Sequence, residues 1–241
     1  MKKNIFLYTL MISLFFGTIA AQDIDSIRLT HILKNLKLDK TKIREELCIE
    51  KKMPNADDSY IAVIPVILNQ DQEDYVFTVQ NYIVITDSKG TIKNKYFDPT
   101  ELDSDAVNLR SFSIDTGLYT ISSTIRAFGV KADFVGSSKP NPYASGKISL
   151  YYPEGKTLKK VLDQFEMDST TGEWDTRCNG EFKDDHSYII LDSSKTNKFA
   201  DLKIKTISVT TINNEVKGEC EEKETSKTTY KTLNFKNGKY Q

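Results

Sequence analysis

The sequence predicts a mainly β fold, made of antiparallel sheets and preceded by a short helical lead-in. After residue 60, runs rich in Val, Ile, Tyr, Phe and Thr recur at intervals of roughly 10 to 15 residues, with turn residues between them. Only residues 23–50 carry apolar side chains at helical spacing. The chain also has 12 Tyr and 12 Phe, enough to fill a core. This pattern is typical of a β-propeller-like array, a sandwich or a barrel.

The first 21 residues have the layout of a secretory signal peptide. Lys2 and Lys3 precede an apolar run over residues 5–16, and small residues follow up to Ala21. The run is shorter than the 20 or so residues that a membrane-spanning helix needs. We therefore predict cleavage after Ala21, a periplasmic or secreted protein, and no membrane span after cleavage.

Residues 22–55 are predicted to form the helical lead-in, and residues 56–241 the β-rich body. Apolar residues from Ile24 to Leu36 recur at helical spacing. Asp39 or Thr41 can cap a second short helix. Pro54 then marks the start of the boundary with the body.

The first strands of the body are predicted over residues 61–68 and 75–86. Pro65 has no N–H to donate, which implies a sheet edge or a bulge there. In the second strand, only Asn81 interrupts a face formed by Tyr75, Phe77, Val79, Ile83 and Ile85. A turn at residues 87–90 leads into a return strand.

Later strands are expected near residues 107–114, 124–135, 147–152, 188–191, 202–211 and 228–235. Apolar faces are formed in the second of these by Phe128, Val130, Ala132 and Phe134, and in the third by Ile148, Leu150 and Tyr152. Residues 157–168 are compatible with either a strand or a helical turn. A change of apolar phase between Ile204 and Ile207 predicts a bulge or bend, and Asn237-Gly238 predicts a tight turn.

Charge and motifs exclude several functions. Without the signal peptide the chain has 31 basic and 34 acidic residues, a net charge of −3, so we expect no nucleic-acid partner. Its two histidines, His31 and His186, fall in the helical lead-in and in an acidic loop. Catalytic, phosphate-binding and zinc-binding motifs are absent from the sequence. We therefore assign no catalytic residue, cofactor or metal, and expect a binding protein rather than an enzyme.

Three cysteines in an exported chain predict one disulfide and one free thiol. Cys48 has apolar neighbours, whereas Cys178 and Cys220 lie in polar, glycine-containing segments. Of the three possible pairings we favour Cys178 with Cys220, which would stabilise the fold by roughly 4 kcal/mol in the chain-entropy model. The alternative is that all three cysteines stay reduced.

The segment GEWDTRCNGEF, residues 172–182, contains the only tryptophan. Glu173, Trp174 and Asp175 form a candidate binding surface, and as a pair of acids beside a tryptophan they could also serve a carbohydrate hydrolase. Tyr143, at the centre of the predicted loop 136–146, is a further candidate.

A structural role for the same segment is the favoured interpretation. In it, Cys178 anchors the corner, Trp174 is buried in the core, and Gly172 and Gly180 let the chain turn on either side.

One loop resembles the FG-GAP-type turn of β-propeller proteins. In residues 193–202, Asn197, Asp201 and Leu202 match its pattern, whereas Ser193, Lys195 and Lys198 replace ligands or the glycine. Because a lysine opposes a divalent cation, the resemblance implies a turn and an Asp-Leu strand entry without calcium.

The chain also resembles exported, functionally uncharacterised β-rich proteins of Gram-negative, Bacteroidota-type bacteria. The similar segments are residues 63–65, 126–129, 172–178 and 237–240. The resemblance implies export and a β-rich fold. We expect a binding or envelope-associated protein whose partner is a protein or a glycan of the cell envelope. The alternatives are the carbohydrate hydrolase and an inhibitor or immunity factor against a cell-wall hydrolase.

Overall fold

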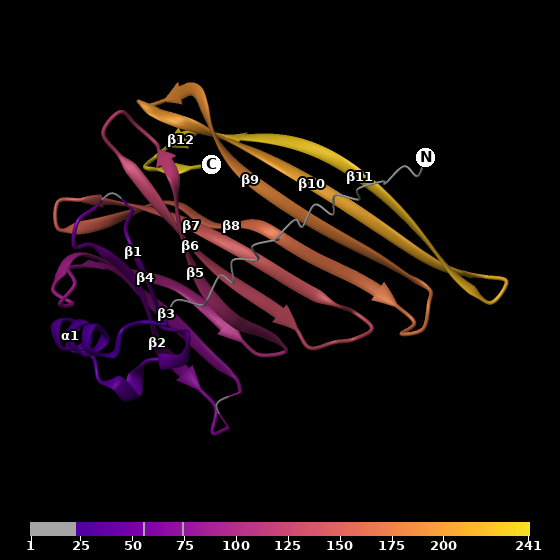
Figure 1. The fold of residues 1–241 in the computed structure, drawn as a ribbon, viewed down its shortest axis with the longest axis horizontal. Coiled ribbons are helices and arrows are strands. Elements are labelled where there is room, and N and C mark those ends of the chain that lie inside the picture. Colours follow the sequence, from indigo (N-terminus) through magenta and orange to yellow (C-terminus); the bar gives the residue numbers. More distant parts are fainter. Residues whose placement is uncertain (1–22, 55, 74) are drawn as a thin grey trace, which may run out of the picture.

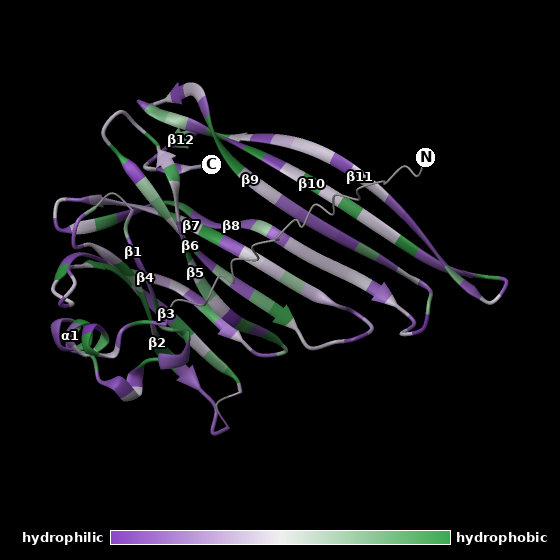
Figure 2. Cartoon of the chain, in the orientation of Figure 1, coloured by the Kyte–Doolittle hydropathy of each residue, from purple (hydrophilic) through white to green (hydrophobic). Residues whose placement is uncertain are grey.

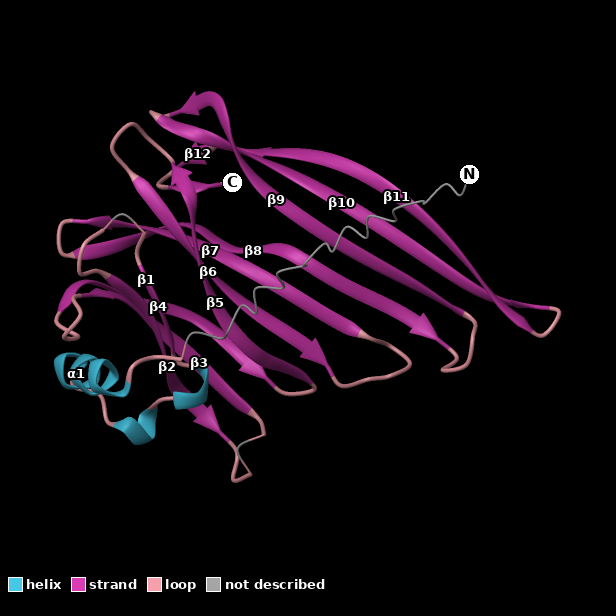
Figure 3. Ribbon diagram, viewed as in Figure 1, coloured by secondary structure: helices cyan, strands magenta, loops and turns pink. Residues whose placement is uncertain are grey.

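The computed structural model describes residues 23–54, 56–73 and 75–241. It confirms a mainly β fold with antiparallel pairing and one α-helix near the N-terminus (Figure 3). The prediction of a signal peptide falls on residues 1–21, outside the described residues. The strands form a curved, barrel-like sheet that continues into a long extension (Figure 1).

Helix α1, Ser26–Leu36, covers the outer face of the sheet at β2 and β3. The Asp25 side chain caps it by accepting a hydrogen bond from the Arg28 backbone N–H, and Lys37 ends it in the left-handed conformation. Leu29, Ile32 and Leu33 pack against the adjacent strands. The Arg28 guanidinium fastens the helix by its 2.6 Å ion pair with Glu50.

The second predicted helix is replaced by two 3-10 turns, Lys40–Lys42 and Glu45–Leu47. Asp39 does cap the first of them, as the sequence suggests. Ile43 between them is extended and pairs with Val66, so helical backbone cannot pass through it. Cys48 after them is buried, and burial together with Glu45 and Glu46 raises the pKa of its thiol to about 12.

Eight strands form the barrel-like part in the order β1-β2-β3-β4-β8-β7-β6-β5. They are β1 Ile49–Lys52, β2 Tyr60–Gln70, β3 Phe77–Thr86, β4 Ile92–Ser104, β5 Val107–Thr120, β6 Arg126–Gly136, β7 Tyr143–Glu154 and β8 Thr157–Trp174. The two ends of the row approach each other, where the Lys51 ammonium donates to the Ile114 carbonyl at 3.0 Å. Residues 157–168, left open by the sequence, are strand.

The interior of the barrel-like part is an apolar core built from alternating side chains. The predicted inward faces of β3 and β6 are confirmed, since Phe77, Val79, Ile83, Ile85, Phe128, Val130, Ala132 and Phe134 all belong to it. Tyr75 lies before β3 and is 73% exposed. Pairing of β2 with β1 ends at Val63, but the predicted edge at Pro65 is not free, because the Pro65 carbonyl accepts a 3.0 Å hydrogen bond from the Arg44 N–H and Val66 pairs with Ile43.

The neighbouring strands β4 and β8 are joined by little backbone pairing. The two strands share a single parallel register position, Lys95 with Thr157. Side chains supplement it, because Asn94 Nδ2 donates to the Gly155 carbonyl at 2.8 Å. We call this junction the β4–β8 seam.

A buried ion pair lies beside the seam. Lys160 donates to Asp98 at 2.8 and 3.1 Å and to Asp163 at 2.6 Å, and both Asp98 and Lys160 side chains are only 4% exposed. The Tyr151 hydroxyl donates to Asp98 at 2.6 Å. Burial alone would raise the pKa of Asp98, but hydrogen bonds from Lys160, Tyr151 and the Thr100 backbone outweigh it and lower that pKa.

The extension consists of β9 Gly180–Thr196, β10 Phe199–Val216 and β11 Glu219–Leu233, which we call the wing. β9 pairs with the second half of β8 from Asp168 to Trp174, and β10 and β11 follow outward. Figure 2 shows that the wing strands are more hydrophilic than the strands of the barrel-like part.

One end of the wing packs on the outer face of β7 and β8 through a second apolar cluster. The predicted face of Ile148, Leu150 and Tyr152 is part of this cluster, with Leu202, Ile204 and Leu233 from the wing. The short strands β12 Phe235–Lys236 and β13 Lys239–Tyr240 close it, joined by the predicted turn at Asn237-Gly238.

Two local predictions in the wing need correction. The bulge lies between Ala200 and Leu202, whereas pairing from Leu202 to Val216 with β11 is continuous, so no shift occurs between Ile204 and Ile207. The FG-GAP-like segment is a β-hairpin turn in which Asn197 and Lys198 both have positive φ. The strand begins at Phe199, before the Asp-Leu pair.

We predict that Asp98→Asn lowers the free energy of unfolding by about 3–5 kcal/mol, because it leaves the buried Lys160 ammonium without its main counter-charge. Denaturant unfolding followed by circular dichroism measures the change. Glu101→Gln, an exposed acid on the same strand, is the control and should shift stability by no more than about 0.5 kcal/mol. Equal stability of the two variants would contradict the prediction.

Candidate functional site

The turn between β8 and β9, residues 175–179, is organised by Asp175. Its carboxylate accepts hydrogen bonds from the backbone N–H groups of Arg177 and Cys178 at 2.8 and 2.9 Å, and from the Asn179 side chain at 2.8 Å. These bonds lower the pKa of Asp175 to about 2. Asp175 therefore serves as the acceptor that shapes the turn.

The predicted disulfide between Cys178 and Cys220 is confirmed. It joins this turn to the first residues of β11, with Cα atoms 5.6 Å apart, and so spans β10. A hydrogen bond of 2.9 Å from the Glu215 N–H to the Asn179 side chain supports the same link. The tip of the wing is thereby fixed to the end of β8.

Trp174 is not in the core, contrary to the structural interpretation of the sequence. It lies half-buried on the sheet surface, 6.2 Å from the Phe182 ring, and its indole N–H donates to the Lys139 carbonyl at 2.5 Å. The indole thus ties the β6–β7 connection to the end of β8.

Gly172 and Gly180 are strand residues rather than turn residues. Gly172 is paired with Phe182 and Gly180 with Trp174. A Cβ on Gly180 would lie 2.4 Å from the Cβ of Trp174, and one on Gly172 would lie 2.6 Å from the Phe182 ring. The glycines are therefore needed to make room for the two aromatic side chains.

The structure does not bring the four predicted surface residues together. Side chains alternate along β8, so Glu173 and Trp174 point to opposite faces of the sheet. Tyr143 is the first residue of β7, not the centre of a loop, and it pairs with Thr171, which places it on the face of Glu173. Asp175 is held in the turn.

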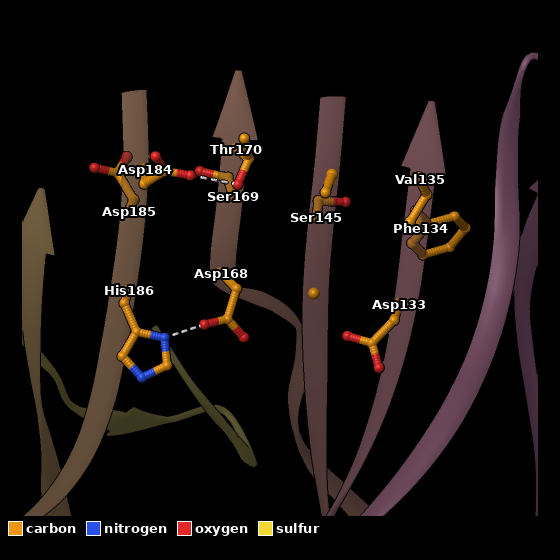
Figure 4. Close-up of a pocket in the computed structure, with 12 residues that line it drawn as sticks. Asp133, Phe134, Val135, Ser145, Asp168, Ser169, Thr170, Asp184, Asp185 and His186 are labelled. Atoms are coloured by element: carbon orange, nitrogen blue, oxygen red, sulfur yellow. Dashed lines mark hydrogen bonds and ion pairs between the residues drawn. The ribbon is translucent and has the colours of Figure 1, made fainter. Parts of the chain in front are cut away.

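A groove of about 360 Å³ lies instead across β6, β7, β8 and β9. Asp133, Asp168, Asp184 and His186 supply its charged and polar groups, and Gly146 lies on the strand between Asp133 and Asp168. Figure 4 shows these two aspartates on either side of β7, with His186 facing Asp168. We call this feature the acidic groove.

Lys131 crosses the groove and partly neutralises it. Its ammonium lies 3.0 Å from an Asp133 oxygen and 2.7 Å from an Asp168 oxygen. A Cβ on Gly146 would lie 2.3 Å from the Lys131 Cε, so the glycine gives this side chain its path over β7. Burial would raise the pKa of Asp168, but the bonds to Lys131 and His186 lower it.

The β9 side of the groove combines polar and aromatic groups. His186 Nδ1 is hydrogen-bonded to Asp168, and its ring meets the Tyr188 ring edge-on at 4.6 Å. Asp184 accepts a hydrogen bond from the Thr170 hydroxyl at 2.6 Å. Phe182 and Tyr188 continue the same face of β9 on either side of these residues.

Sequence reasoning missed this groove. It placed His186 in an acidic loop, whereas His186 lies within a strand. A signal was present, because Phe182, Asp184, His186 and Tyr188 alternate at the period of a strand. Lys131 and Asp133 lie far from Asp168 and His186 in the sequence. Only strand pairing makes them neighbours in the fold.

Comparison with protein-family models, with curated proteins and with solved structures gives no match. Within residues 23–54, 56–73 and 75–241, no cluster of three or more His, Cys, Asp or Glu side chains could hold a metal ion. In the same described part of the chain, no helix is long and apolar enough to cross a membrane.

The chemistry of the acidic groove suits hydrogen bonding to a ligand. Three carboxylates and one bridging ammonium leave it an excess of acceptors and negative charge. The neighbouring aromatic rings offer apolar faces to the same ligand. The groove is open to solvent, and its volume is within the range of small-ligand sites.

We predict that the Asp175 carboxyl titrates with a midpoint near 2. Since its pKa is lowered in the folded state, its contribution to stability is present above the ordinary aspartate pKa and is lost as the pH falls toward 2. Carbon-detected NMR of the side-chain carboxyl measures the midpoint. An ordinary aspartate midpoint near 4 would contradict the hydrogen bonding described for the turn.

Proposed function

We propose that this protein is an exported binding protein whose acidic groove binds a hydroxyl-rich ligand, a glycan of the cell envelope. The observation that carries the proposal is the groove itself, in which acceptor side chains from β6, β8 and β9 lie on either side of Gly146 on β7. The aromatic side chains beside it, Phe182 and Tyr188, support the same ligand class.

Carboxylates and aromatic rings are complementary to a sugar. Sugar hydroxyls are donors, and charge-assisted hydrogen bonds to Asp168 and Asp184 are stronger than neutral ones. The C–H faces of a sugar ring are apolar and can pack on an aromatic ring. The strands fix these groups before a ligand arrives, which lowers the ordering cost of binding.

Export is supported by the disulfide as well as by the predicted signal peptide. Structural disulfides persist in oxidising compartments such as the periplasm or the extracellular space. A groove exposed on the surface of an exported protein is accessible to envelope glycans. We therefore propose a periplasmic or secreted location.

Binding is favoured over carbohydrate hydrolysis by the state of the carboxylates. A glycosidase needs a general acid with a raised pKa, whereas the pKa values of Asp168 and Asp175 are both lowered. Glu173 and Asp175 also do not face Trp174 across a cleft, because Glu173 points to the opposite face and Asp175 is committed to the turn.

We predict that soluble peptidoglycan disaccharides or neutral oligosaccharides bind without being cleaved, and that Asp184→Asn weakens binding about tenfold. The reason is the loss of a charged acceptor, worth about 1.5–3 kcal/mol. Calorimetric titration measures the Kd, and product analysis by chromatography tests for cleavage.

Glu173→Gln is the matched control, since it makes the same chemical change on the opposite face. It should bind like the wild type. Failure of every glycan to bind at millimolar concentration, or equal weakening by Glu173→Gln, would contradict the proposal. Cleavage that Glu173→Gln abolishes would instead establish the hydrolase.

A further inference from the structure

Strand β11 forms a long, exposed edge of the wing. It contains 15 residues, and every one except Leu233 is exposed. Within the described residues it pairs only with β10. Figure 1 shows it as the outermost strand of the wing, with its far side open.

This edge lacks several features that usually prevent strand pairing. Native edges are blunted by proline, by bulges or by very short strands. β11 has no proline, its 15 residues pair with β10 without a register shift, and three of its central residues are Thr225, Thr228 and Thr229, which favour strands. Its outward backbone N–H and C=O groups can therefore bond to another strand.

The charges on β11 are segregated along its length. The first six residues, 219–224, contain four glutamates and one lysine, and the remaining nine contain Lys227 and Lys231 and no acid. An edge with lysines along its entire length would repel a second copy in either direction. A strand that is acidic at one end and basic at the other repels a parallel copy and attracts an antiparallel one.

We propose that β11 pairs antiparallel with β11 of a second copy of this chain, about a two-fold axis at Ser226. The two wings would then form one continuous six-stranded sheet. The register that overlaps the whole of β11 places Glu221 opposite Lys231, and the symmetry gives this pair twice. In this register no like charges are directly opposite.

Neighbouring registers are less favourable. Two-fold symmetry allows shifts of two residues only, because directly opposite residues must point to the same face. A shift in one direction places Lys223 opposite Lys227, and a shift in the other places Lys223 opposite Lys231. The charges thus select the full-length register.

The disulfide prepares the edge for pairing. It fixes Cys220, the second residue of β11, to the β8–β9 turn on the other side of β10. The Glu215 N–H bond to Asn179 holds the end of β10 at the same place. The edge is therefore ordered before association, which reduces the entropy cost of forming the dimer.

Sedimentation equilibrium of the oxidised protein tests the proposal. We expect a monomer–dimer equilibrium, and a dimer Kd about tenfold or more weaker for either Glu221→Lys or Lys231→Glu, since each places like charges opposite one another twice. The double variant with both substitutions should regain the wild-type Kd. Glu181→Lys, an exposed site on β9, is the control and should leave the Kd unchanged.

Mixing the two single variants gives the sharpest test. A heterodimer of Glu221→Lys with Lys231→Glu has opposite charges at both positions, so it should form although each homodimer is weak. Thermal melting checks that each variant is folded. A protein that stays monomeric at all concentrations, or a dimer that these substitutions do not affect, would overturn the proposal; the latter would assign the contact to another surface.

Discussion

The ion pair between Lys160 and Asp98 joins β8 to β4, two neighbouring strands that share little backbone pairing, and so keeps the barrel-like sheet closed there. The β4–β8 seam has one parallel register position, and a sheet that opened there would expose the apolar core. Burying two charges is costly, so the pair stabilises the fold only because hydrogen bonds from Tyr151 and to Asp163 satisfy both partners. The junction between β4 and β8 thus depends on a network of hydrogen-bonded charged groups that is buried beside the apolar core.

The wing begins on the part of β8 that lies beyond the β4–β8 seam. The first half of β8 lies beside β4 and β7, whereas its second half is free of β4 and pairs with β9. Bulges in β8, one of them around Gln164 with positive φ, separate the two halves. The acidic groove lies on the second half. Its geometry therefore depends on the core that anchors the first half, and Phe134 belongs to both the groove lining and that core.

Residue patterns predicted local structure well and spatial neighbours poorly. Alternation identified the inward faces of β3 and β6, because burial on one face imposes a two-residue period. The polarity around Cys178 and Cys220 predicted their disulfide. The prediction for Trp174 was wrong. A large apolar side chain suggests burial in the core, but Gly180 opposite Trp174 leaves room for the indole on the sheet surface. The Lys131 bridge was invisible to sequence reasoning, since it joins residues whose proximity is set by strand order.

A double-mutant cycle on Asp98→Asn and Lys160→Met tests whether the buried ion pair stabilises the β4–β8 seam. The free energies of unfolding of the wild type, both single variants and the double variant give the coupling energy between the two side chains. We predict a coupling of about 2 kcal/mol or more, against less than about 1 kcal/mol for the ion pair Lys183–Asp185 of the wing, where the lysine is largely exposed. Equal coupling for the two pairs would contradict the claim that the buried pair holds the seam.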